Sequence, residues 1–163
     1  SVVSGYARKK PDKAEGMGST VTLAVVEQGL ATIANVGDSR TYLWRNGELK
    51  QITEDHSLTA SLIAAGNLPP EAIYDHPQRH VIYRCLGLEG YVEADVFSPV
   101  QLQSGDGLLL CSDGLWEMLR SPQPMVEVLK STPHPTEACH QLVQMANDAG
   151  GEDNISVVIA RFE

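Results

Sequence analysis

The sequence predicts an α+β fold that is built mainly on antiparallel sheets. Two observations lead to this prediction. Short runs rich in β-branched and aromatic residues, separated by turn residues, occupy most of residues 21–111. Two helical patterns then follow near 121–130 and 135–148, and an apolar run at 155–162 closes the chain as a strand.

The first strands are expected in four consecutive runs, VTLAVVEQ, GLATIANVGD, RTYLWRN and ELKQIT, between residues 21 and 53. Gln28-Gly29 and Asn46-Gly47 stand at two of the joins, and Asn-Gly strongly favours a tight hairpin turn. These runs are therefore predicted to form one antiparallel meander.

The next segment, SLTASLIAAG at residues 57–66, has the pattern of a short helix. Ser57 or Thr59 is expected to cap its beginning, and Gly66 to end it. Strand patterns resume in HVIYRCLG (80–87), YVEADVFSPVQL (91–102) and GLLLCSD (107–113).

Composition limits the class of protein. The 163 residues fit one domain, and 42% hydrophobic residues are enough for a sizeable core. A net charge of -9 argues against nucleic acid as a partner, because phosphate backbones bind basic surfaces.

No apolar run approaches the roughly 20 residues of a membrane span. The first residues, SVVSGYARKK, do not have the pattern of a secretory signal. We therefore expect a cytoplasmic protein with no membrane partner.

The three cysteines, Cys85, Cys111 and Cys139, are widely spaced and odd in number. They form no CxxC pair, so the sequence supports neither a zinc ribbon nor a disulfide framework. Cys111 lies inside a predicted strand with no histidine nearby in the sequence. It is therefore expected to be a core residue rather than a nucleophile.

Three aspartates share one setting at strand ends. Asp38 follows ATIANVG, Asp113 follows LLLCS, and Asp153 precedes the strand ISVVIARF. In an antiparallel sheet, the end of one strand and the beginning of its neighbour lie at the same edge. We therefore expect Asp113 and Asp153 to face each other, with Asp38 on a nearby strand.

Clustered carboxylates raise one another's pKa unless a cation neutralises them. Oxygen ligands of this kind suit hard ions such as Mg²⁺ and Mn²⁺. The other interpretation is that these aspartates only cap turns, as Asp often does. Spacing alone does not decide between the two.

Six blocks of the sequence carry a resemblance to a known family. They are GMGST (16–20), ANVGDSRTYLWRNG (34–47), QITEDHSL (51–58), HPQRHVIYRCLG (76–87), GDGLLLCSDGLWE (105–117) and GGEDNISVVIARF (150–162). In this order they resemble the metal-dependent serine/threonine protein phosphatases of the 2C type, the PPM family. The resemblance covers nearly the whole chain.

The resemblance implies two antiparallel sheets packed face to face as a sandwich, flanked by helices, with metals in a cleft at one end. It implies that Asp113 and Asp153 bind a pair of catalytic Mn²⁺ or Mg²⁺ ions, and that Asp38 serves a third, weaker site. Glu117 stands where the family often carries Asp, which implies a third-site ligand with a longer arm.

The activity implied is hydrolysis of phosphoserine and phosphothreonine in proteins by a metal-activated water. The resemblance assigns no catalytic side chain and no organic cofactor. Residues 57–84 resemble the flap of bacterial members, which favours a bacterial source; we call them the flap segment.

The family's domain opens with an Arg-bearing strand, a Glu-Asp pair and an Asp-Gly-x-Gly-Gly block. EGMGST at 15–20 is not that block, because KKPDKA before it is no apolar strand. Residues 1–163 are therefore predicted to be the C-terminal portion of one phosphatase-like domain, N-terminally incomplete. Alone, this chain is expected to be weakly active or inactive, and to self-associate through exposed sheet edges.

Two other functions remain open. One is a non-catalytic pseudophosphatase or interaction domain of the same fold. The other, a cation-binding domain unrelated to phosphatases, is disfavoured by the GDSR and DN blocks.

Several side chains have competing interpretations. Asp75, His76 and His80 have the composition of a metal site, but their polar, Pro-containing context favours an exposed loop. Arg40 is expected in a structural ion pair, with a phosphate contact as the alternative. His56 is expected to support a turn where the flap segment begins.

Overall fold

The computed structural model describes residues 2–9, 16–87 and 91–163. In chain order, the elements are α1 (Val2–Lys9), β1 (Val21–Glu27), β2 (Leu30–Val36), β3 (Arg40–Arg45), β4 (Glu48–Gln51), α3 (Leu58–Ala64), α4 (Ala72–Asp75), β5 (Asp95–Gln101), β6 (Gly107–Cys111), α5 (Asp113–Leu119), α6 (Gln123–Ser131), α7 (Pro135–Asp148) and β7 (Val157–Arg161).

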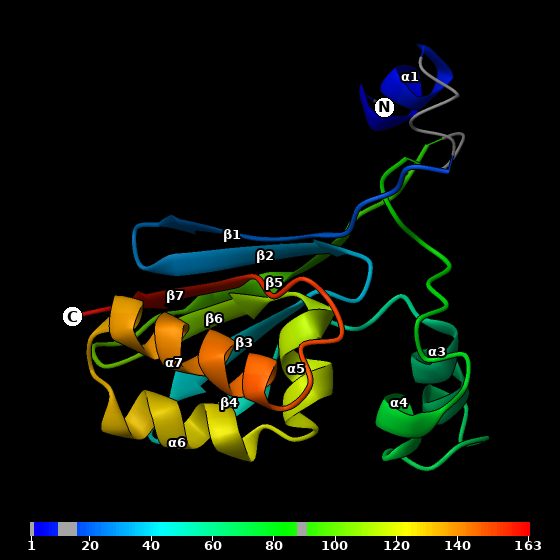
Figure 1. The fold of residues 1–163 in the computed structure, drawn as a ribbon. Coiled ribbons are helices and arrows are strands. Elements are labelled where there is room, and N and C mark those ends of the chain that lie inside the picture. Colours follow the sequence, from blue (N-terminus) through cyan, green and yellow to red (C-terminus); the bar gives the residue numbers. More distant parts are fainter. Residues whose placement is uncertain (1, 10–15, 88–90) are drawn as a thin grey trace.

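The strands form two antiparallel sheets, which lie face to face (Figure 1). One has the order β1-β2-β5 and the other β4-β3-β6-β7. Ile33 and Leu43 lie in the apolar layer between the sheets, with Leu108. A second layer, which includes Leu109 and Leu142, lies between the four-stranded sheet and α5, α6 and α7. The predicted sandwich with flanking helices is confirmed.

The two predicted hairpin turns are confirmed. Gln28 and Gly29 have φ of 51° and 79°, and Asn46 and Gly47 have φ of 53° and 81°. Positive φ at both central residues is the geometry of the tight turns that match the twist of paired strands. β1 pairs with β2 across the first turn, and β3 with β4 across the second.

The prediction of one continuous meander is wrong. β2 ends at Val36 in the three-stranded sheet, and β3 begins at Arg40 in the other sheet. The chain crosses between the sheets at Gly37, which has φ of 105° and lies so close to Thr20 that a Cβ would collide with that side chain. The glycine therefore permits the crossing that the strand pattern did not reveal.

The helices that were predicted near 57–66, 121–130 and 135–148 are confirmed as α3, α6 and α7. The Ser57 hydroxyl accepts a hydrogen bond from the Ala60 N–H at 3.2 Å, so Ser57 is the cap of α3. Helix α5 was not predicted, because Ser112 and Asp113 directly follow the apolar run of the preceding strand in the sequence.

The strand predicted at 80–87 is wrong. Its backbone makes only isolated pairings, Ser57 with Ile82 and Ser19 with Leu86. An alternating apolar pattern forms a strand only when another strand lies alongside, and here the neighbours are the beginning of the flap segment and the chain before β1.

The flap segment lies beside the sandwich, with α3 and α4 stacked next to the end that carries α5 (Figure 1). Several contacts join α4 to the α5 region. Arg120 binds Asp75 at 2.6 Å, and the ring of Tyr74 lies edge-on to Trp116 at 6.3 Å between centroids. Within the described ranges, no helix is both long and apolar enough to cross a membrane.

Candidate metal site

The sheet register brings the three strand-end aspartates to one edge. Arg40 at the beginning of β3 pairs with Cys111 at the end of β6, and Cys111 pairs with Val157 at the beginning of β7. Asp38 and Asp153 precede two of these strands, and Asp113 follows the third. The structure therefore places all three at the same end of the four-stranded sheet, as expected from strand ends alone.

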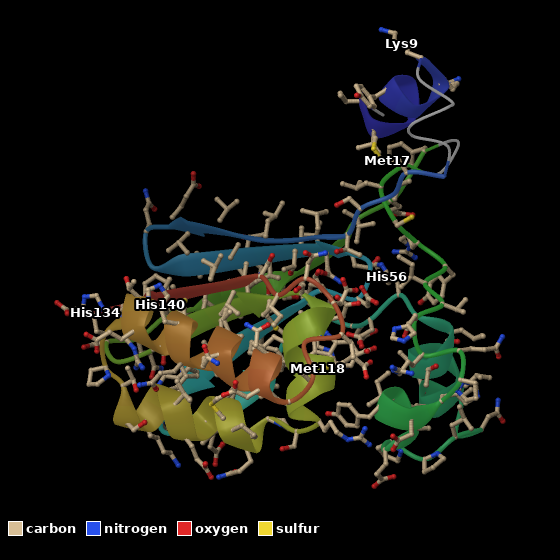
Figure 2. The ribbon with its side chains drawn as sticks, in the orientation of Figure 1. Lys9, Met17, His56, Met118, His134 and His140 are labelled. Atoms are coloured by element: carbon tan, nitrogen blue, oxygen red, sulfur yellow. The ribbon has the colours of Figure 1, made fainter. Side chains whose placement is uncertain are left out.

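A cavity of about 420 Å³ opens at this edge. All four carboxylates that were predicted as ligands line it, and α5 supplies both Asp113 at its beginning and Glu117 one turn later. Met118, labelled in Figure 2, marks the α5 wall of the cavity. The lining residues are Thr20, Asp38, His80, Ile82, Asp113, Gly114, Glu117, Met118, Glu152 and Asp153.

Asp38 and Asp113 have raised pKa values in the absence of a cation. Burial raises the pKa of Asp38 to about 7, and the charges of Asp113, Asp55 and Glu117 add to this effect. Burial also raises the pKa of Asp113, and the nearby Asp153 raises it further, while the Gly114 N–H opposes the shift. A cation in the cavity would relieve this repulsion.

Glu117 is only 7% exposed, and burial raises the pKa of its carboxyl group. His80 and Arg79 of the flap segment oppose that shift by their positive charge. The Arg79 Nε atom lies 3.4 Å from Glu117 Oε2, and the His80 Nδ1 atom lies 3.6 Å from the same oxygen. The flap segment therefore contributes directly to this side of the cavity.

Gly114 allows the two loops that carry Asp113 and Asp153 to approach each other. A Cβ at this position would lie 2.5 Å from the backbone oxygen of Asn154. Asp113 accepts a hydrogen bond from the Gly114 N–H at 2.9 Å, and Asp153 accepts one from the Asn154 N–H at 2.6 Å. Each aspartate thus fixes the turn that carries it, and the absence of a side chain between the turns keeps the carboxylates together.

Trp116 links α5 to the backbone of Asp38. Its indole N–H donates to the Asp38 carbonyl at 3.0 Å, and its ring lies under the Arg40 guanidinium. Arg40 donates to both carboxylate oxygens of Asp55, the shorter bond being 2.6 Å, and to the Tyr42 hydroxyl at 3.3 Å. The guanidinium therefore forms a buried ion pair, as expected, and does not line the cavity.

His56, labelled in Figure 2, hydrogen-bonds to the backbone of Gly37 and to Asp95. Its Nδ1 atom accepts a hydrogen bond from the Gly37 N–H at 3.0 Å, so the proton of the neutral ring is on Nε2. Nε2 lies 2.9 Å from Asp95, to which it donates. The histidine therefore fixes the crossing between the sheets, rather than the beginning of the flap segment alone.

The disfavoured metal site of Asp75, His76 and His80 is not formed. Asp75 pairs with Arg120, and the His76 Nδ1 atom accepts from the backbone of Gln78. His80 instead lines the acidic cavity. Cys111 is 3% exposed, and burial raises the pKa of its thiol to about 12, which fits a core residue.

Sequence reasoning missed several residues of the cavity. Glu152 adjoins Asp153 in the sequence and Met118 adjoins Glu117, so both lie next to a predicted ligand. Thr20, His80 and Ile82 adjoin none of the predicted ligands, and they come from the chain before β1 and from the flap segment.

The donor set fits a hard divalent cation, because it consists of carboxylate oxygens that are partly buried and mutually repelling. Within residues 2–9, 16–87 and 91–163, however, no three His, Cys, Asp or Glu side chains are close enough to enclose an ion. The described carboxylates therefore line the cavity from several directions without forming a coordination shell.

Comparison with known proteins assigns the family. The family model for protein phosphatase 2C matches residues 4–61. The serine/threonine phosphatase stp of Listeria monocytogenes is 45% identical over 154 residues, which is 94% of this chain and 60% of that protein. The PstP phosphatase of Mycobacterium tuberculosis is 37% identical over 160 residues, which is 98% of this chain and 30% of that protein.

Solved structures agree. A crystal structure of Mycobacterium tuberculosis PstP/Ppp superposes with a TM-score of 0.91 at 37% identity, covering 100% of this chain and 67% of that one. The structure of the Streptococcus agalactiae serine/threonine phosphatase superposes with a TM-score of 0.88 at 34% identity, and the match covers 99% of this chain and 68% of that one. The chain belongs to the protein phosphatase 2C family. It spans about 60% of the length of the Listeria relative.

Proposed function

We propose that the protein is a metal-dependent phosphatase that hydrolyses phosphoserine and phosphothreonine in proteins. One observation carries this proposal: Asp38, Asp113, Glu117 and Asp153, from distant points of the sequence, line a single cavity. The cavity lies at the end of a fold whose relatives are named serine/threonine phosphatases.

We propose that these four carboxylates bind Mn²⁺ or Mg²⁺, with Asp113 and Asp153 at the catalytic pair and Asp38 and Glu117 at a third, weaker site. The catalytic domain of PstP has been solved in complex with two manganese ions, and it superposes with a TM-score of 0.84 at 35% identity. Bound cations of this kind supply an activated water and offset the charge of a phosphoryl group.

The chain's own residues hold this donor set in place. Gly114 leaves room for Asp113 and Asp153 to approach each other, and the Trp116 indole fixes the Asp38 backbone. The oxygen donors lie at the ends of rigid strands and helices. Such elements hold coordinating groups in a fixed geometry.

Hydrolysis is favoured over the non-catalytic alternative because the relatives are named phosphatases. The isolated 163-residue chain is nevertheless expected to turn over substrate weakly or not at all, since its described side chains do not enclose an ion. Adjacent cations need carboxylates on every side to offset their mutual repulsion. We propose that residues 1–163 form one portion of a phosphatase domain, with residues 57–84 as its flap.

A chimera tests the function without depending on the isolated chain. In it, this chain replaces the 154 matching residues of the Listeria monocytogenes phosphatase. We expect manganese-dependent hydrolysis of a phosphothreonine peptide, and loss of that hydrolysis in the Asp113→Asn and Asp153→Asn versions. A folded chimera without manganese-dependent hydrolysis would contradict the proposal.

We further propose self-association through open sheet edges. Among the described residues, β1 and β7 each lack a neighbouring strand on one side. A groove of about 370 Å³ lies between them, where Val21 and the 59% exposed Val158 are found. Unpaired edges beside apolar side chains favour strand addition. Light scattering should show association that Val158→Lys reduces; a monomer at all concentrations would contradict it.

We also propose a bacterial source and a cytoplasmic location, with phosphorylated proteins as substrates. The relatives named above come from bacteria. Cys85, Cys111 and Cys139 are free thiols, which fits a reducing compartment.

A further inference from the structure

One arginine of the flap segment, Arg79, contacts two of the carboxylates that line the acidic cavity. The Arg79 Nε atom lies 3.4 Å from Glu117 Oε2, and its Nη2 atom lies 3.2 Å from Glu152 Oε2. Arg79 is 24% exposed and Glu117 only 7%, so this contact is partly shielded from solvent. A planar guanidinium can bind two carboxylates at once, which a lysine cannot do with the same geometry.

A second ion pair between the flap segment and the rest of the fold provides a contrast. Arg120 binds Asp75 at 2.6 Å, and both side chains are more than half exposed. Neither residue lines the acidic cavity. The two arginines therefore hold the same flap segment, but only Arg79 touches a candidate metal ligand.

The cavity gathers several negative charges near Arg79. A fixed positive charge there offsets part of the repulsion between the carboxylates, as a divalent cation would. The Arg79 guanidinium and a divalent cation cannot bind Glu117 together without repelling each other. Like charges a few ångström apart interact strongly in a partly buried site.

We infer that Arg79 is a positioning residue, which holds Glu117 in the metal-free protein and competes with a divalent cation for its carboxylate. Cation binding then weakens the attachment of residues 76–84 to the cavity. This inference rests on the proposed metal site, and it adds a residue of the flap segment to the control of that site.

Manganese titration by calorimetry on the 163-residue chain tests the competition. Arg79→Gln should bind Mn²⁺ roughly three- to tenfold more tightly than the unsubstituted chain, because a nearby positive charge has been removed. Arg120→Gln is the matched control: it makes the same change of charge on the other flap contact, and should leave the affinity unchanged. Arg79→Lys should restore most of the original affinity.

A double-substitution cycle separates competition for Glu117 from a general change of charge. In the Glu117→Gln background, Arg79→Gln should no longer tighten manganese binding, because the shared carboxylate is absent. A tightening of equal size in both backgrounds would overturn the inference.

Hydrogen exchange of the flap segment is a readout that does not involve activity. The Val81 N–H donates to Gln78 O and the Tyr83 N–H to His56 O, so both amides are protected in this structure. Manganese should speed their exchange in the unsubstituted chain. In Arg79→Gln their exchange should already be fast without metal and change little when metal is added.

The outcomes distinguish this inference from the proposed function. If Asp113→Asn weakens manganese binding but Arg79→Gln does not tighten it, the metal site stands and the role of Arg79 is wrong. If Asp113→Asn binds manganese like the unsubstituted chain, both are wrong. If neither the unsubstituted chain nor any variant binds manganese, the role of Arg79 is wrong. Flap exchange that is identical with and without manganese also overturns the role of Arg79.

Discussion

The guanidinium of Arg40 lies over the ring of Trp116, with Cζ 3.4 Å from the ring centre. The same guanidinium binds Asp55, and the same indole donates to the backbone of Asp38. A buried ion pair, an aromatic ring and the main chain of a candidate metal ligand therefore form one connected unit. The support of the acidic cavity extends well behind the carboxylates that line it.

Breaking the Arg40–Asp55 pair is expected to destabilise the fold strongly. Arg40→Met keeps the length of the side chain but leaves the buried Asp55 carboxylate without its partner. Removing one member of a buried pair typically costs about 3–5 kcal/mol, and urea unfolding measures this loss. Arg120→Met, which breaks the exposed pair with Asp75, is the control and should change stability little. Equal losses in the two variants would contradict the prediction.

Gly114→Ala is expected to separate the two loops that carry Asp113 and Asp153. The added methyl group would lie 2.5 Å from Asn154 O, so the loops must move apart. Manganese affinity, measured by calorimetry, should fall, and stability should fall by about 1–3 kcal/mol from overpacking.

Gly66→Ala is the control for this substitution. Gly66 has φ of 74° and no atom near its would-be Cβ, so alanine there strains only the backbone. It should lower stability modestly and leave manganese affinity unchanged. A Gly114→Ala protein that binds manganese normally would show that the close approach of the loops is not needed.

Stability in the presence of a chelator should fall as pH rises, because of Asp38. Burial raises the pKa of this carboxyl from 3.8 to about 7 in the folded protein. Between these values the folded state binds more protons than the unfolded state, so each unit of pH rise removes folding free energy until the folded pKa is passed. The stabilising effect of the protonated carboxyl is complete below about pH 4 and lost above about pH 7.

Asp38→Asn removes this dependence while keeping the shape of the side chain. The difference in free energy of unfolding between Asp38→Asn and the unsubstituted chain should therefore grow by about 2 kcal/mol from pH 5 to pH 8. Urea unfolding in EDTA at several pH values measures the difference. Parallel curves would mean that Asp38 titrates normally.

Cys111 is expected to be unreactive in the folded protein. It is 3% exposed, and burial raises the pKa of its thiol to about 12, so almost no thiolate forms at neutral pH. Cys85 and Cys139 are only partly buried. Alkylation followed by mass spectrometry should label Cys111 only when the chain unfolds. Fast labelling of Cys111 under native conditions would contradict the assignment to the core.

The sequence allowed prediction of the features that depend on local patterns. The turns at Gln28-Gly29 and Asn46-Gly47, the Ser57 cap and helices α6 and α7 all follow from short-range preferences of the backbone. The meeting of Asp113 and Asp153 also followed, because antiparallel pairing determines which strand ends adjoin. The sandwich itself and the roles of these residues came from resemblance to a family.

Features that depend on distant parts of the chain were not predictable in this way. Residues 80–87 have a strand pattern but lack a neighbouring strand to pair with. The crossing at Gly37 depends on contact with Thr20, which is remote in sequence. His80 lines the cavity, and Arg79 contacts its carboxylates, only because the flap segment folds back onto α5. Nothing in DHPQRH indicates that path.

Trp116 also makes the protein its own optical probe. Its indole is 3% exposed and bonded to the Asp38 backbone, directly behind the carboxylates. The chain's other tryptophan, Trp44, is buried in β3. In a Trp44→Phe background, emission would come from Trp116 alone. The binding of a cation in the acidic cavity could then be followed in real time by tryptophan fluorescence, with no dye or label attached.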